Sequence, residues 1–71
     1  MDEFFINALQ GELNNARHQG ASPKAVRMHP TQLQRIEVDY RITYGDGGRQ
    51  LEGVLLVADD AVPLGEYEFD R

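Results

Sequence analysis

Apolar residues recur at helical spacing near the start of the chain, at Phe5, Leu9, Leu13 and Ala16. Steps of four, four and three place these side chains on one face of a helix. Asp2 and Glu3 suit the positive end of the helix dipole, and Gly20 is placed to end the helix. The pattern predicts an amphipathic helix over residues 2–18, with Phe4 off the apolar stripe and exposed.

Residues 35–44 instead alternate without interruption between polar and apolar side chains. The apolar set is Ile36, Val38, Tyr40, Ile42 and Tyr44. Side chains of a strand point to opposite faces with a period of two, so this pattern predicts a strand with one buried and one wet face. Such strands are typical of antiparallel sheets covered on one side only. We therefore expect both tyrosines of the set on the core side.

Glycines and proline divide the rest of the chain. Gly45–Gly48 predicts a hairpin turn into a returning strand over residues 49–58, with Gly53 as a bulge or a point of close backbone approach. Further strands are predicted over 25–28 and 66–69, and one helical turn over 30–34. The predicted fold class is α+β: one N-terminal helix packed on a small antiparallel sheet, with a central hairpin at about 35–58. Residues 1–71 are expected to form a single domain.

The size of the chain limits how it is stabilised. A domain of 71 residues buries only about 60% of the surface that its unfolded chain exposes. The sequence contains no cysteine, so disulfides and thiolate metal sites are excluded. Association with another chain is the remaining route to extra stability.

Charge is unevenly distributed along the sequence. Residues 1–51 hold six acids and six bases, so the whole net charge of −5 arises in residues 52–71. No basic footprint is present to neutralise phosphates, so we expect no direct contact with nucleic acid. No apolar run approaches the length of a membrane span. We expect a soluble intracellular protein, or one packaged from the cytoplasm, whose partner is a protein.

Candidate reactive groups all have simpler explanations. Gly45–Gly48 lacks the lysine of a phosphate-binding loop and fits a turn better. Asp59, Asp60 and Glu66 lack the spacing of dedicated cation loops. His18 and His29 fit a helix end and a turn before proline. We therefore predict no enzyme activity, no cofactor and no metal, with a module using His18, His29, Asp59 and Asp60 as the minor alternative.

Protein contact is the function that these observations leave open. Exposed apolar surface is expected at Phe4 and Tyr67, and acidic surface at the end of the chain. The candidate protein-binding residues are Phe4, Asp59, Asp60, Glu66, Tyr67 and Glu68.

Residues 27–69 resemble a segment of the tailed-phage major capsid protein family. The similar residues are Val26-Arg27-Met28-His29-Pro30, Leu33, Ile36, Asp46-Gly47, the run Leu51 to Pro63, and Gly65-Glu66. Members of that family run a strand into Met-x-Pro, a helix, a glycine-containing turn, Leu-x-Gly-x-Pro-Val-Val and Val-Pro-x-Gly. They are several times longer than this chain, and they place mostly helix where residues 35–44 alternate.

The resemblance implies a phage or prophage origin rather than a shell-forming capsid protein. Together with the lack of a reactive site, it favours a small non-enzymatic protein with an accessory structural or assembly role. Its partner would be another copy of the chain or a virion protein, and its location would be the host cytoplasm or the virion. The alternative is an acidic decoy that binds a basic surface of a host nucleic-acid-binding or defence protein, as the charge of residues 52–71 suggests.

Overall fold

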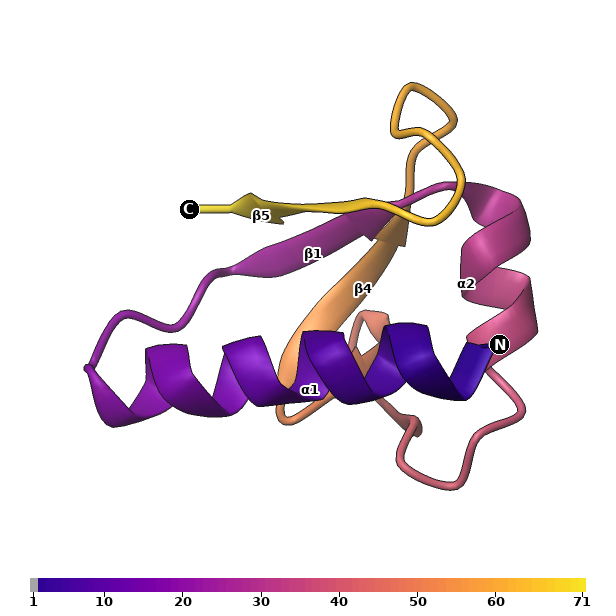
Figure 1. Ribbon diagram of the computed structural model, residues 1–71. Helices are drawn as coiled ribbons and strands as arrows, with labels where there is room; N and C mark the ends of the chain where they lie inside the picture. Colours follow the sequence, from indigo (N-terminus) through magenta and orange to yellow (C-terminus); the bar gives the residue numbers. More distant parts are fainter. Residues whose placement is uncertain (1) are drawn as a thin grey trace.

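In the computed structural model, which describes residues 2–71, helix α1 (Asp2–His18) lies along one face of a five-stranded sheet (Figure 1). Its buried residues are Ile6, Leu9, Leu13 and Ala16. The predicted helix is confirmed. Phe5 lies at the edge of the apolar stripe and is only partly buried, and Ile6 takes its place in the core.

The strands follow as β1 (Ala25–Met28), β2 (Thr43–Gly45), β3 (Gly48–Leu51), β4 (Val54–Ala58) and β5 (Tyr67–Asp70). Their order across the sheet is β2-β3-β4-β1-β5. Three neighbouring pairs are antiparallel, whereas β1 and β4 run parallel. The α+β class, with an N-terminal helix on a mostly antiparallel sheet, is confirmed.

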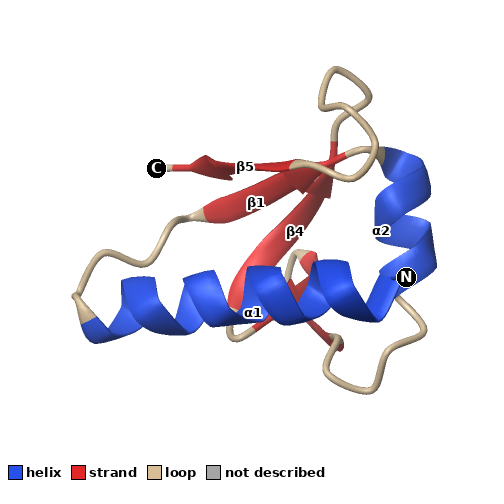
Figure 2. Cartoon of the chain, viewed as in Figure 1, coloured by secondary structure: helices blue, strands red, loops and turns tan. Residues whose placement is uncertain are grey.

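Helix α2 (Pro30–Ile36) stands beside the start of α1, at one end of the sheet (Figure 2). It contributes Leu33 and Ile36 to the same core as the α1 stripe. Val26, Met28 and Leu56 supply the sheet side of that core. The opposite face of the sheet carries partly buried Leu55 and Val57 with exposed Arg27. The core is therefore a single layer between the two helices and one face of the sheet.

The predicted strand over residues 35–44 is wrong. Arg35 and Ile36 end α2, residues 37–42 form a connector of turns, and only Thr43 and Tyr44 of the predicted strand belong to β2. Ile36 and Ile42 are buried as expected. The other three apolar residues of the set are exposed, with Val38 at 88%, Tyr40 at 89% and Tyr44 at 69%.

Local capping explains why helix replaces strand here. His29 caps α2, with its Nδ1 accepting a hydrogen bond from the Thr31 amide at 3.1 Å, and Pro30 occupies the first turn. Leu33 and Ile36 are then three residues apart on one helical face. The helix consequently continues two residues beyond the predicted single turn over 30–34.

The predicted returning strand over 49–58 is two strands. Glu52 and Gly53 both have positive φ, 53° and 77°, and form a two-residue turn between β3 and β4. Gly53 therefore belongs to a hairpin turn and not to a bulge. The turn at Asp46-Gly47 is confirmed, while the last strand lies at 67–70, one residue later than predicted.

The contrast between Ile42 and Thr43 tests this packing. Ile42 is 7% exposed in the core cluster, whereas Thr43 is exposed. Ile42→Asp should lower the free energy of unfolding by about 3 kcal/mol or more, because it buries an unpaired charge. Thr43→Asp should cost less than about 1 kcal/mol. Thermal melts followed by circular dichroism measure both, and equal losses in the two variants would contradict the burial of Ile42.

Candidate functional site

A hollow opens where the start of α1, the helix α2 and the loop before β5 meet. Its volume is about 360 Å³, and it is lined by Asp2, Phe4, Phe5, Ala8, Gln32, Arg35, Gly65 and Tyr67. We call the hollow lined by these residues the aromatic hollow. Phe4 is 83% exposed, as predicted, whereas Tyr67, which was also predicted to be exposed, is partly buried against the core. The fold thus brings together Phe4 and Tyr67, two of the predicted binding residues that lie at opposite ends of the sequence.

Aromatic packing forms one wall of the hollow. The Phe5 and Tyr67 rings meet edge to face, with 5.6 Å between centroids and 86° between planes. Tyr67 also stacks on Phe69 at 5.6 Å. Burial, followed by a hydrogen bond to Glu12, raises the pKa of Tyr67 to about 12. The phenol is therefore neutral at physiological pH and presents an uncharged aromatic surface.

Gln32 and Arg35 bring polar groups from α2 to the same hollow. Gln32 is only 4% exposed, and its Nε2 has no hydrogen-bond partner among residues 2–71. Buried amide donors without a partner are rare in folded proteins because leaving one unpaired costs free energy. Arg35 lies one turn further along α2 and is exposed. The hollow is therefore apolar with a polar rim, a composition typical of binding sites.

A second hollow of about 310 Å³ adjoins the first and shares Asp2 and Arg35 with it. Its other lining residues are Glu3, Ile6, Ile36, Val38 and Asp39. The exposed side chains of Phe4 and Val38 therefore belong to adjacent hollows at the same end of the molecule. Exposed apolar residues that gather in this way mark interaction surfaces more often than isolated ones do.

The predicted acidic residues do not gather in one place. Asp59 pairs with Arg27 at 3.5 Å, and its Oδ1 accepts a hydrogen bond from the Ala61 amide, so it stabilises the loop after β4. Asp60 and Glu66 are exposed in that loop. Glu68 stands opposite Arg27 in the β1–β5 register, one residue from Tyr67 and so on the other face of β5. Glu66 lies between Gly65 and Tyr67 of the aromatic hollow in the sequence, whereas Glu68 follows Tyr67 but faces away from it.

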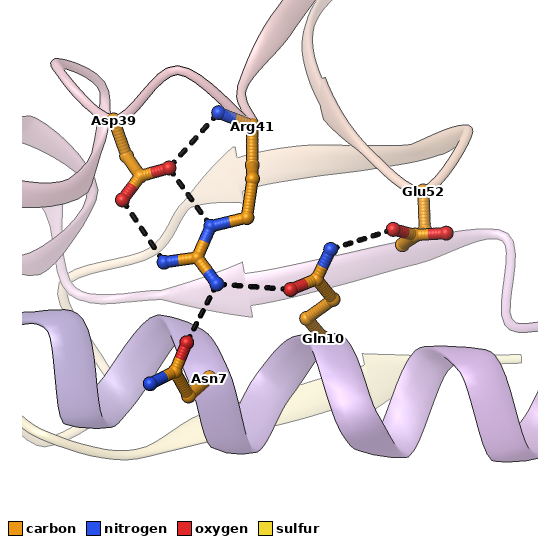
Figure 3. A network of polar contacts seen from close by, with 5 residues as sticks. All are labelled: Asn7, Gln10, Asp39, Arg41 and Glu52. Carbon is orange, nitrogen blue, oxygen red and sulfur yellow. Dashed lines mark hydrogen bonds and ion pairs between the residues drawn. The ribbon is translucent and has the colours of Figure 1, made fainter.

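A polar network ties the connector to α1 (Figure 3). The guanidinium of Arg41 donates to both carboxylate oxygens of Asp39, at 2.9 and 3.0 Å. It also donates to the side-chain oxygens of Asn7 and Gln10 on α1, at 2.6 and 2.9 Å. Gln10 in turn donates to Glu52 at 2.8 Å, in the positive-φ turn between β3 and β4. Three segments distant in the sequence are therefore joined by one arginine and one glutamine.

This network holds the connector that carries Val38 and Tyr40 into solvent. Asp39 also accepts a hydrogen bond from the Arg41 backbone amide, which closes a local turn. The side-chain hydrogen bond from Arg41, followed by its backbone hydrogen bond, lowers the pKa of Asp39 below the ordinary value of 3.8. The same pairing raises the pKa of Arg41. Asp39 therefore stays negatively charged and Arg41 positively charged across the physiological pH range.

Of the four residues of the minor alternative, His18, His29 and Asp59 have structural roles, and Asp60 is exposed. His18 contacts the Asn14 carbonyl oxygen at 2.8 Å at the end of α1, and His29 caps α2. Within residues 2–71 there is no group of three or more His, Cys, Asp or Glu side chains placed to hold a metal ion. In the same part of the chain, no helix has the length and apolarity needed to cross a membrane.

Comparison of the chain with protein-family models, with curated proteins and with solved structures finds no match. The interpretation of the site therefore rests on the residues themselves.

Several residues of the candidate site were missed by the sequence patterns. Gln32 and Arg35 lie where a helical turn and a strand were predicted, and Arg41 was placed on a wet strand face. Only the continuation of helical spacing from Leu33 to Ile36 was available as a signal for the first two. Nothing in the sequence pairs Arg41 with Asn7 and Gln10, because that contact joins segments far apart in the chain.

The pKa of Asp39 predicts how its contribution to stability depends on pH. A carboxyl whose pKa is lower in the folded state stabilises the fold above its unfolded pKa and loses that effect as pH falls through the folded pKa. Asp39→Asn should therefore lower the urea midpoint at pH 7, and this deficit should shrink as the pH falls below 3.8. Urea melts at pH 7, 4 and 2.5 measure it, with the exposed Asp60→Asn as control. A deficit independent of pH would contradict the ion pair.

Proposed function

We propose that this chain is a small non-enzymatic phage or prophage protein that acts through protein–protein contact, in an accessory structural or assembly role. The observation that carries the proposal is the exposed Phe4 beside the aromatic hollow. An aromatic side chain left in water next to an apolar recess is typical of a surface that another protein covers.

The geometry of the polar network supports a binding role in a second way. Arg41 donates hydrogen bonds that hold the connector against α1. The connector residue Val38 lines the second hollow together with Asp2 and Arg35. A surface held in place before binding loses less conformational entropy when a partner docks. The arrangement therefore favours recognition by a preformed face.

The phage origin rests on the resemblance of residues 27–69 to the capsid protein segment. That segment runs from β1 through α2 and both hairpins into β5. It includes Gln32, Arg35, Gly65 and Tyr67, which supply half of the lining of the aromatic hollow. The segment that carries the resemblance therefore supplies half of the proposed binding surface, and the start of α1 supplies the other half, including Phe4.

The acidic decoy has weaker support. Arg27 lies 3.5 Å from Asp59 and 3.7 Å from Asp70, so part of the negative charge at the end of the chain is compensated on the sheet. Glu52 lies in the turn between β3 and β4 and pairs with Arg17 at 3.3 Å. The other acids are divided between the loop after β4 and the outer face of β5. A decoy that imitates a phosphate backbone needs its acids on one continuous surface.

Purified particles from a lysogen that carries this gene test the proposal. We expect the chain to co-purify with the particles through a density gradient. Phe4→Ser should lower its amount there by about tenfold, as loss of a central aromatic anchor does at many interfaces. The measurement is quantitative mass spectrometry of the gradient fractions.

Tyr44→Ser is the matched control, because Tyr44 is an exposed aromatic residue on β2, outside the hollow. Its variant should remain with the particles at the wild-type level. A wild-type chain that is absent from the particles, together with unchanged particle yield when the gene is deleted, would refute the structural or assembly role.

A further inference from the structure

We propose that the aromatic hollow is a self-complementary interface, through which two copies of this chain form a twofold-symmetric dimer. Phe4 of each copy enters the hollow of the other. The proposal rests on the proposed function and names the first partner of that surface as a second copy of the chain.

The projecting Phe4 ring and one wall of the recess lie on the same helix, α1. Phe4 and Ala8 are one helical turn apart, so both stand on the same side of α1, and Ala8 leaves space because its side chain is small. Phe4 is 83% exposed, whereas Phe5 beside it is partly buried against Tyr67. A cavity of about 150 Å³ holds a benzene ring. The hollow of about 360 Å³ is therefore large enough to admit a phenylalanine side chain.

The position of Phe4 and the aromatic hollow on one patch favours twofold symmetry. When one patch supplies both complementary features, two copies satisfy each other about a twofold axis and the assembly closes. The neighbouring hollow extends the surface from Phe4 towards Val38, which is 88% exposed. The contact therefore extends beyond a single ring, and a specific interface needs such an extended area.

Charge on the rim agrees with the same symmetry. Asp2 and Arg35 line both hollows and carry opposite charges. Among the described residues, no ion pair joins either of them to another side chain. In a twofold contact each copy offers an acid and a base from one patch, so Asp2 of one copy can face Arg35 of the other, twice. The remaining charged side chain of the adjoining rim that lacks an ion pair in the structure is Glu3.

A charge-swap experiment on the purified chain tests this arrangement. Asp2→Arg gives copies with two rim bases, and Arg35→Asp gives copies with two rim acids. Each variant alone should dimerise at least about tenfold more weakly than the wild type, because like charges then meet twice. An equimolar mixture should form a heterodimer with a dissociation constant within about threefold of the wild type. Sedimentation equilibrium measures all three.

The heterodimer separates contact between copies from effects within one copy, since an intramolecular role for either residue gives no rescue on mixing. Phe4→Ser should weaken the dimer by at least about tenfold, and Tyr44→Ser should leave it unchanged. Circular dichroism verifies that each variant is folded. A wild-type chain that stays monomeric at millimolar concentration, or a mixture that stays as weak as its components, overturns the dimer. Co-purification with particles tests the proposed function separately. If the chain is monomeric but still needs Phe4 to co-purify with the particles, the dimer is refuted and the proposed function stands.

Discussion

The contact between the apolar stripe of α1 and strands β1 and β4 is the interaction on which the rest of the structure depends. Leu9, Val26 and Met28 are completely buried in it. The sheet has no second layer, so the helices must cover one face with few side chains. Because α1 lies along the sheet, its first turn lies near α2 and packs Phe5 against Tyr67 at the start of β5. The position of the aromatic hollow is a direct result of this packing.

A second, polar layer of organisation lies outside the core. Arg41 connects Asn7, Gln10 and Asp39, and Gln10 extends the connection to Glu52. Bidentate arginine–carboxylate contacts define direction as well as distance. The connector between α2 and β2 can therefore be irregular and still occupy one position. It leaves Val38 and Tyr40 in water, and Val38 lines the second hollow.

The elements with a local cause were the ones that the sequence predicted. The α1 stripe, strand β1 and the Asp46-Gly47 turn each depend on neighbouring residues. The prediction for residues 35–44 was wrong because Ile36 and Ile42 would be buried in the predicted strand and are also buried in the observed helix and turns. The helix and turns are favoured over a strand by the cap at His29 and by the hydrogen bond of Arg41 to α1. Phe4 and Tyr67 were predicted as exposed apolar surface, but the hollow between them depends on tertiary packing that no pattern encodes.

The place of β1 in the sheet has a consequence for how the chain reaches this structure. Strand β1 is the first to be made, yet its two neighbours, β4 and β5, come from the far end of the sequence. Both of its ladders must therefore close over long loops, one of them parallel, before its backbone groups are satisfied. Contacts so distant in sequence slow folding. Until closure, α1 and β1 expose their apolar sides together, so the early chain is the state most prone to aggregation.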